Sequence, residues 1–447
     1  MVVFILIALA VLLGVLFCMV YVSFRTARFP FVQRLAGGRK RVAVLIAFFF
    51  YLLVSIALSC WMNVINAIIC IIHFGGFWLL SELLFHIIGK VTRRKVRGTI
   101  GKAERRKTRD TVGETERRKT RDTIPGICAM VFTICYMAAA WYLCTHVRET
   151  DYVLESSKLT GNLRIVQIAD SHMGATFDAQ GLHDYILQIN ALAPDIVVIT
   201  GDFVDDDTTR EDMIGSCEAL ADLETKYGVF FCYGNHDKGY FSEDSRGWNN
   251  AEFLENLEKN GVTVLQDEAQ LVEGRVNDAA VPPDAQQESN DDTTVLSDES
   301  QQIDNNFSDA AVPPDETQQA DDRFYVLGRK DKSEEERGGS RKTPEELMAD
   351  LDPDIYKIVL DHQPCEFDEE AQAGADLVLC GHTHGGQFFP FNWMGVLTRQ
   401  YERSYGHERR GSTDFIVTSG ISDWTLLFKT GCQSEYVCID VHGTDGG

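Results

Sequence analysis

The sequence predicts a layered α/β domain preceded by about four membrane-spanning helices. Long apolar stretches almost free of charge are confined to residues 1–146, whereas short β-branched runs alternate with helical or loop segments over residues 147–447. The balance of basic and acidic residues changes at the same boundary, between residues 146 and 147. Of the 42 Lys+Arg and 66 Asp+Glu, residues 1–146 hold 20 and 6, which leaves 22 and 60 for the rest. We therefore expect a basic membrane anchor followed by an acidic globular domain.

Four apolar stretches have the roughly 20-residue length that an α-helix needs to cross a bilayer. They cover residues 2–21, 42–61, 67–88 and 125–144. The second and third are separated only by a short polar hinge that holds Asn63 and Asn66. The first stretch could be a cleaved signal peptide, but it has neither a basic start nor a small-residue cleavage site. We expect a multi-pass protein of the cell membrane.

The loops between these stretches predict the orientation, because short cytoplasmic loops collect Lys and Arg. Residues 22–41 hold six basic residues and no acid, and residues 90–123 hold 14 basic and 5 acidic residues. The second loop contains ERRKTRDT twice, at 104–111 and 116–123. This repeat could bind a partner or RNA, but a topology determinant is the simpler interpretation. Both loops are expected in the cytoplasm, which places residues 147–447 outside it.

The acidic character of residues 147–447 argues against nucleic acid as a partner, because its open surface repels phosphate backbones. Residues 273–322 are acidic even within this region, with 14 Asp+Glu, one Arg and the repeat DAAVPPD. Such a composition cannot bury enough apolar surface to fold. We expect a disordered insert between the strands GVTVL and RFYVLG. A calcium-binding tract is the alternative, but the carboxylates lack the spacing of a known loop.

Polar side chains follow five of the predicted strands. The strands are 163–169, 195–200, 229–233, 356–360 and 376–380, and they lead into DSH, GDFVD, GNHD, DHQP and GHTHGG. A single motif of this kind is usually a turn or a helix cap. In layered α/β folds, however, the carboxyl ends of the strands form the crevice where ligands bind, so groups far apart in sequence can converge. All five together indicate a site.

The side chains in these motifs predict the type of cofactor. Carboxylate, amide and imidazole groups without a thiolate suit Mn, Fe or Zn. Seven such ligands are too many for one tetrahedral zinc ion and match two metals that share a bridging ligand. We expect two divalent metal ions, with Mn first and Zn or Fe as alternatives.

The five motifs resemble those of the calcineurin-like metallophosphoesterases, and the similarity extends over about residues 162–441 apart from the insert. With helices in front, the chain is similar to the membrane-anchored YaeI/YkuE type and to the layout of the transmembrane protein with metallophosphoesterase domain. The resemblance implies a four-layer αββα sandwich over residues 147–447. It assigns Asp170, His172 and His384 to one metal, Asn235, His362 and His382 to the other, and Asp202 to a bridge between them.

The resemblance also implies a reaction, the hydrolysis of phosphate mono- or diesters by attack of a metal-bridging hydroxide. His236 would donate a proton to the leaving oxygen, since its imidazole titrates near neutral pH. Asp205 resembles the family carboxylate that orients this histidine, and Asp237 is a candidate for supporting the ligands. A domain anchored beside a bilayer makes lipid-linked or cell-envelope phosphoesters plausible substrates.

Two other functions compete with this one. The first is a catalytically silent phosphoesterase fold that binds a ligand or acts as a sensor, but such proteins usually lose metal ligands and none is missing here. The second is a transporter or sensor in which the helices are the working part. The four helices lack the internal repeat and the midplane charges that transport sites tend to show. We therefore favour the enzyme.

Overall fold

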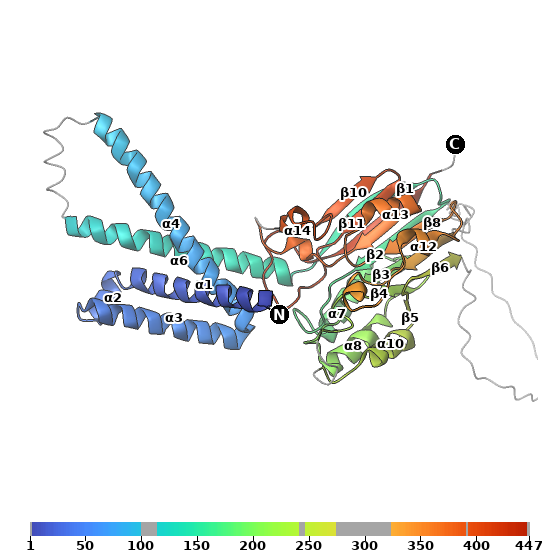
Figure 1. The fold of residues 1–447 in the computed structure, drawn as a ribbon, viewed down its shortest axis with the longest axis horizontal. Helices are drawn as coiled ribbons and strands as arrows, with labels where there is room; N and C mark the ends of the chain where they lie inside the picture. Colours follow the sequence, from blue (N-terminus) through green and yellow to red (C-terminus); the bar gives the residue numbers. More distant parts are fainter. Residues whose placement is uncertain (1, 100–113, 241–245, 274–322, 390–391, 445–447) are drawn as a thin grey trace, which may run out of the picture.

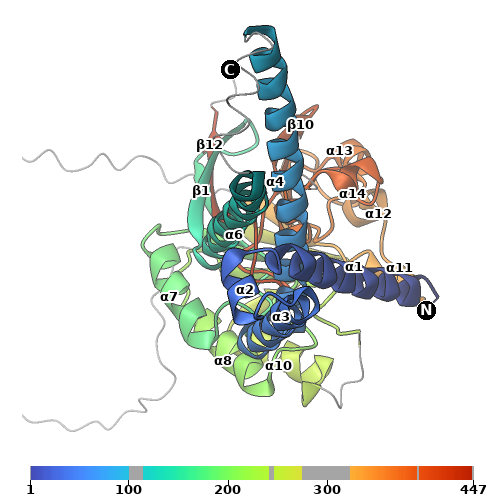
Figure 2. The same ribbon diagram turned by 90° about the vertical axis from the view of Figure 1, so that its left-hand side faces the viewer.

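The computed structural model describes residues 2–99, 114–240, 246–273, 323–389 and 392–444. A bundle of long helices comes first in the chain, and two packed β-sheets with short helices follow it (Figure 1). When the molecule is turned by 90°, the helix bundle is seen end-on in front of the sheets (Figure 2).

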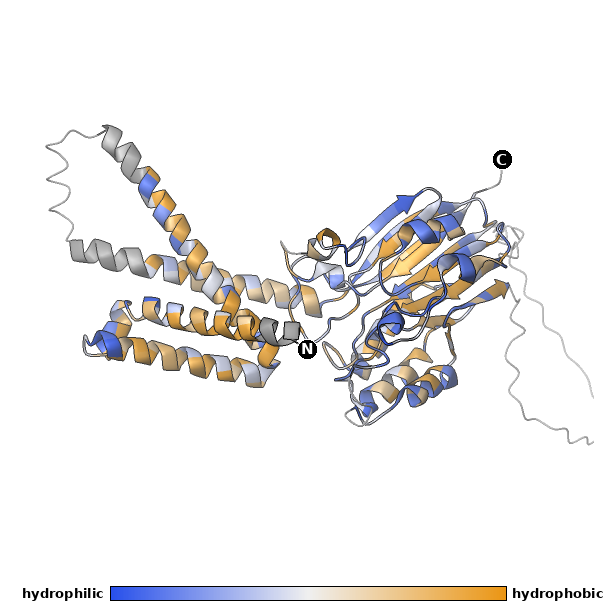
Figure 3. Cartoon of the chain, viewed as in Figure 1, coloured by the Kyte–Doolittle hydropathy of each residue, from blue (hydrophilic) through white to orange (hydrophobic). Residues whose placement is uncertain are grey.

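Within residues 2–99 and 114–145, the bundle contains four long helices and one short one. Their bounds are α1 Val2–Thr26, α2 Pro30–Leu35, α3 Lys40–Met62, α4 Val64–Thr99 and α6 Glu114–Thr145. The four long helices contain segments that are long and apolar enough to cross a membrane, at Leu9–Thr26, Lys40–Met62, Val64–Val91 and Thr123–Thr145. Their outer surfaces are largely hydrophobic (Figure 3), and side chains such as Leu53 and Ile134 are about two-thirds exposed. The four expected helices are confirmed, and their apolar surfaces are those of a membrane protein.

The polar hinge between α3 and α4 joins the bundle to the sheets. Asn63 ends α3 with a φ of 75°, and its Oδ1 accepts a hydrogen bond from the Asn66 backbone at 2.9 Å. The buried Asn66 side chain donates to Thr425 O at 2.9 Å and accepts from Leu427 N at 2.9 Å. We call this set of contacts the hinge clamp. It fixes residues 425–427 to the membrane helices.

A second attachment lies at the end of α6. Lys429 N donates to Ala140 O at 3.0 Å, and Ser434 N donates to Leu143 O at 2.9 Å. The Ser434 hydroxyl also donates to Cys144 O at 2.7 Å. The segment between residues 423 and 434 is thus held by the bundle at both of its ends.

In the described part of the chain, twelve strands form two six-stranded sheets. In spatial order, the first sheet is β1 Arg148–Ser156, β12 Glu435–Gly443, β2 Asn162–Ile168, β3 Ile196–Thr200, β4 Val229–Cys232 and β5 Val262–Val264. The second is β10 Gly406–Arg410, β11 Thr413–Val417, β9 Leu377–Cys380, β8 Tyr356–Leu360, β7 Arg323–Gly328 and β6 Glu268–Glu273. Strands β2 to β5 are parallel, as are β7, β8, β9 and β11.

Helices cover the outer face of each sheet, as Figure 1 shows. They are α7 Ala179–Asn190, α8 Arg210–Leu220 and α10 Asn250–Lys259 on the first sheet, and α12 Pro344–Met348 and α13 Phe367–Ala373 on the second. Successive residues of a strand point to opposite faces, so Ile165 packs between the sheets while Val166 packs under the helices. This arrangement confirms the expected αββα sandwich. The short elements α11 Ser333–Glu336, η1 His384–Gly386 and α14 Met394–Leu397 lie in the connections.

The acidic insert leaves the second sheet at a hairpin. Strands β6 and β7 are antiparallel, and Glu273 pairs with Arg323. The expected preceding strand is therefore wrong, because GVTVL forms β5 of the first sheet and EAQLVE forms β6. β6 is an edge strand with one buried residue in six, so its pattern is too polar to be recognised. Residues 274–322, in which we expect disorder, lie outside the described residues, and so does the first ERRKTRDT repeat.

Deleting residues 278–321 tests whether the fold needs the insert. Five residues would still join Glu273 to Arg323, enough for a hairpin loop. Because each doubling of loop length costs only about 0.6 kcal/mol, the deletion should leave the melting temperature equal to or slightly above that of the full chain. Thermal unfolding measures this. As a control, a deletion that also removes β6 should lower the melting temperature, and loss of bound metal from the first variant would give the insert carboxylates a role.

Candidate metal centre

The five sequence motifs meet where the carboxyl ends of the two sheets lie side by side. Each predicted strand lies within one residue of its observed position, so the motifs follow β2, β3, β4, β8 and β9. Gln167 joins the sheets just below this point. Its buried Nε2 donates to Thr200 Oγ1 at 2.9 Å and to Cys380 O at 3.0 Å.

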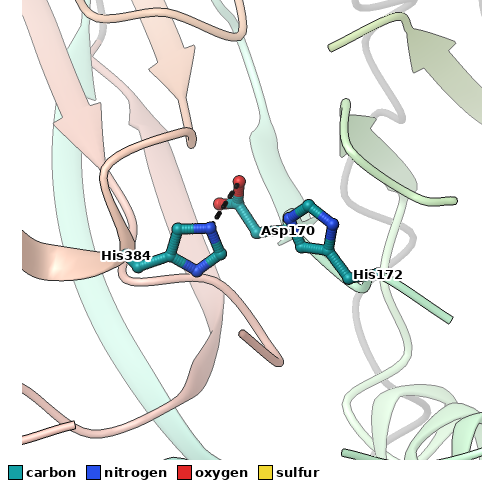
Figure 4. A group of neighbouring side chains, drawn as sticks. All are labelled: Asp170, His172 and His384. Carbon is teal, nitrogen blue, oxygen red and sulfur yellow. Dashed lines mark ion pairs between the residues drawn. The ribbon is translucent and has the colours of Figure 1, made fainter. Parts of the chain in front are cut away.

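Asp170, His172 and His384 form the first group of candidate ligands. One ligand atom from each lies within 4.8 Å of the others, and His384 Nε2 is 3.9 Å from Asp170 Oδ1 (Figure 4). His172 Nε2 is buried and has no hydrogen-bond partner among the described residues. An unpaired buried nitrogen is costly, and a divalent cation between these side chains would satisfy it. The group therefore fits a metal ion.

Asp202, His362 and His382 form the second group, and their ligand atoms also lie within 4.8 Å of one another. Asn235 completes it. The Asn235 Oδ1 is 2.8 Å from His382 Nδ1 and 3.1 Å from His362 Nε2. The amide oxygen thus points to the same place as the two imidazoles, as expected for a fourth ligand.

Asp202 lies between the two groups. Its Oδ2 is 3.0 Å from His362 Nε2 and 3.7 Å from His172 Nε2. One carboxylate oxygen therefore faces an imidazole of each group. A bridging ligand of a two-metal site requires this placement.

The backbone around the site is strained. Five candidate ligands have left-handed φ values, namely Asp170 54°, His172 39°, Asp202 52°, His382 71° and His384 46°. Such values are uncommon for residues other than glycine and cluster at functional sites. Gly201, with a φ of 77°, lies so close to the next loop that a Cβ would collide with Gly234 N and with the His362 ring. The close approach of β3 and β4 at the metal centre requires glycine here.

Asp237 supports the loop that carries Asp202. Its fully buried carboxylate accepts hydrogen bonds from the backbone of Asp202 at 2.8 Å, Phe203 at 2.8 Å and Gly234 at 2.6 Å. These contacts agree with the supporting position expected for Asp237. They hold the ends of β3 and β4 together beneath the ligands.

The structure places Asp205 differently from the expectation. Its Oδ2 is 3.1 Å from His172 Nδ1, so the side chain that it orients is His172 rather than His236. The reason is the path of the backbone, since His172 N donates to Asp202 O and Met173 N to Phe203 O. These bonds lay the loop after β3 along the loop after β2. A carboxylate on the far nitrogen fixes the tautomer of His172 and leaves Nε2 to face a metal.

His236 lies beside the two groups without belonging to either. Its backbone N–H donates to Asp202 Oδ1 at 2.7 Å, and its half-buried ring lies 5.1 Å from each of the rings of His172, Tyr240 and Trp424. The imidazole is therefore close to the ligands, and one face of its pocket is aromatic.

Burial and mutual contact set the charges at the centre. Burial raises the pKa of Asp170 to about 6. Burial opposes charge on Asp202 as well, yet the neighbouring His362 imidazole holds the pKa of Asp202 well below its usual range. Burial lowers the pKa of His382 to about 4 and that of His384 well below its ordinary value. Those two imidazoles are neutral at pH 7 and offer the lone pair that binds a divalent cation.

Asp423 is a site residue that sequence reasoning missed. Its Oδ1 is 3.3 Å from His384 Nδ1, and Gln387 Nε2 donates to its Oδ2 at 2.5 Å. Burial raises the pKa of Asp423 to about 7. The residue follows β11, a sixth strand whose carboxyl end reaches the centre. The signal was therefore present, because a polar residue follows this buried strand as in the other five.

Two adjacent groups of carboxylate and imidazole side chains, each able to hold a metal ion, thus lie at the joined ends of the two sheets. Residues 163–386 match the calcineurin-like phosphoesterase family. The chain belongs to this family. Its members and the two ligand groups support two divalent metal ions.

Three curated relatives show how far the similarity extends. An uncharacterised metallophosphoesterase of Campylobacter jejuni is 27% identical over 65% of this chain and 62% of its own length. The uncharacterised metallophosphoesterase YkuE of Bacillus subtilis is 27% identical over 68% of this chain and 90% of its own. The transmembrane protein with metallophosphoesterase domain of Bos taurus is 23% identical over 61% and 52%. The chain thus spans less than two thirds of two of these relatives.

Replacing Asp202 tests the bridge. If one oxygen serves both groups, Asp202→Asn should reduce bound Mn from about two ions per chain to less than one. Metal analysis of the purified full chain after loading and desalting measures this. The same change at Asp222, which lies on the exposed surface, is the matched control and should leave the count unchanged. Two retained ions in Asp202→Asn would contradict the bridging role.

Proposed function

We propose that this protein is a membrane-anchored phosphoesterase that hydrolyses phosphate mono- or diesters at a centre of two divalent metals, Mn foremost, with Zn or Fe as alternatives. The position of the Asp202 carboxylate between two imidazole-rich groups supports this most directly. Asp170, His172 and His384 would hold one ion, Asn235, His362 and His382 the other, and Asp202 would bridge them. Two cations in these positions would lower the pKa of a shared water and offset the charge of a phosphoryl group.

His236 is the proposed proton donor to the leaving oxygen. Burial lowers the pKa of His236, while the nearby Asp202 carboxylate opposes this shift. The negative charge of a bound phosphoester would raise the pKa again. His236 would therefore gain a proton as substrate binds and lose it to the leaving oxygen. Its backbone contact with Asp202 keeps the ring beside the metal groups.

The test of this function compares two leaving groups. The Mn-loaded full chain should hydrolyse both nitrophenyl and alkyl phosphoesters, and a chelator should abolish both activities. His236→Ala should lower kcat on the alkyl ester by about 10²–10⁴-fold, because an alkoxide needs a proton to leave. The loss should be much smaller on the nitrophenyl ester.

Metal analysis is the control for this experiment, since His236→Ala should retain both ions. Equal losses on the two esters would mean that His236 positions the phosphate. No turnover of either ester by the wild-type chain with two ions bound would contradict the enzyme and favour a silent, ligand-binding fold.

The proposed location is a multi-pass protein with its metal centre outside the cytoplasm. The end of α1, the start of α3, the end of α4 and the start of α6, which flank the two basic loops, lie at the end of the bundle remote from the sheets (Figure 1). This supports opposite sides for the basic loops and the metal centre. A substrate in the same membrane, lipid-linked or part of the cell envelope, suits this location.

A reporter after Gly447 tests the orientation. We expect an alkaline phosphatase fusion to be active outside the cytoplasm and a fluorescent protein fusion to be dark when exported in unfolded form. A reporter in the loop at residue 110 is the control and should give the reverse pattern. Cytoplasmic behaviour of the fusion at Gly447 would overturn the orientation.

A further inference from the structure

Five large apolar side chains are exposed within nine residues beside the metal centre. They are Phe389 at 65%, Trp393 at 49%, Met394 at 43%, Val396 at 38% and Leu397 at 65% exposure. We call them the apolar rim. The last three belong to α14, which lies on the side of the sandwich nearest the helix bundle (Figure 1). Surfaces of this kind mark binding to a protein or a membrane.

The residue just before the rim is packed against the membrane helices. Phe388 belongs to a cluster with Met137 and Ala140 of α6, and its ring lies 5.6 Å from that of His73 in α4. The Tyr136 hydroxyl donates to Phe389 O at 3.5 Å.

These contacts lie inside the segments that can cross a membrane. His73 and Tyr136 are nine residues from the ends of Val64–Val91 and Thr123–Thr145 that face the sheets. Nine helical residues span about 13 Å, so the rim begins beside the apolar spans, below the start of α4 and the end of α6. A bilayer around those helices would therefore reach the rim. A tryptophan among aliphatic and aromatic side chains is typical of the membrane interface.

The same segment borders the metal centre. Gly395 of α14 is packed so closely against Tyr401 that a Cβ would collide with its ring, and the Tyr401 ring lies 6.5 Å from that of His382. On the other side, Trp424 is 44% exposed while its ring lies 5.1 Å from that of His236. Aromatic side chains therefore lie between the rim and the second metal group at Tyr401, and beside the proposed proton donor at Trp424.

A cavity of about 290 Å³ opens between the hinge clamp and the centre. Trp61 and Met62 line it from the membrane side, and Asp205, the partner of His172, lines it from the centre. Its volume is near the lower limit for a small-molecule site. Trp61 is 76% exposed at the end of α3, where the interface is expected.

We propose that the apolar rim lies in the bilayer interface and that the substrate is an amphiphilic phosphoester, which reaches the metal centre while its acyl chains stay in the membrane. This inference rests on the proposed function. Withdrawing each methylene of a lipid from the bilayer costs free energy. A metal centre at the interface avoids that cost, because only the phosphate has to leave the lipid surface.

The first experiment places the rim. The full chain is reconstituted in nanodiscs of brominated phosphatidylcholine, whose bromines quench nearby tryptophans. Trp393→Phe should remove part of the quenched fluorescence. Trp248→Phe is the matched control, since Trp248 is 3% exposed in the sandwich and donates to Thr208 O, and it should remove unquenched fluorescence only. An unchanged quenched fraction in Trp393→Phe would overturn the proposal.

The second experiment concerns the substrate. Dioleoyl phosphatidic acid in nanodiscs is compared with soluble dihexanoyl phosphatidic acid, and the same pair is tested as methyl phosphodiesters. The wild-type chain should prefer the long-chain ester of whichever class it hydrolyses. Leu397→Gln should lower the ratio of long-chain to short-chain turnover by about tenfold, the effect of removing one leucine from an apolar environment. Leu187→Gln on α7, equally apolar and 56% exposed, should leave the ratio unchanged.

The outcomes separate the two proposals. Turnover of soluble esters without a long-chain preference, or with a ratio unaffected by Leu397→Gln, overturns the membrane route and leaves the phosphoesterase intact. No turnover of any ester overturns the proposed function, while the quenching experiment still decides where the rim lies. Cross-linking of two Leu397→Cys chains through this position, together with no quenching, would assign the rim to a contact between copies.

Discussion

The burial of the Asp202 carboxylate at the junction of the two sheets is the constraint on which the rest of the structure depends. An isolated charge in this position would be very unfavourable. It is stabilised from several strand ends at once, by the His362 imidazole, by the His236 backbone and, through the loop it sits on, by Asp237. The two sheets must therefore meet in one register, and the left-handed backbone of the ligand loops follows from that requirement.

The membrane helices share a segment with this centre. Asp423 contacts His384, Trp424 contacts His236, and the next residues are held by the hinge clamp. This segment contacts the helix bundle on one side and the candidate ligands on the other, so the two are physically connected. The helices therefore anchor the domain and also help to define one wall of the site.

The sequence predicted the parts of this molecule in which strong local patterns coincide with burial. Buried apolar strands such as β3 and β8 stand out, and the ligands that follow them were recognisable together. Edge strands such as β6 are largely exposed to solvent, so their hydrophobic pattern is too weak to predict a strand. The partner of Asp205 could not be predicted, since it depends on how two loops lie side by side. Asp423 was missed because it lies six residues beyond the end of β11, farther from its strand than the ligands of the five motifs.

The order of strands in the first sheet has a consequence for synthesis of the protein. β12 lies between β1 and β2 and pairs with both, although it comes almost 270 residues after β2 in the chain. The anchor helices and the four candidate ligands of the first sheet leave the ribosome long before β12, the strand that completes that sheet. Pairings of such high sequence separation form slowly. The domain therefore matures after synthesis, and the nascent chain exposes an unpaired β2 edge that chaperones would need to protect.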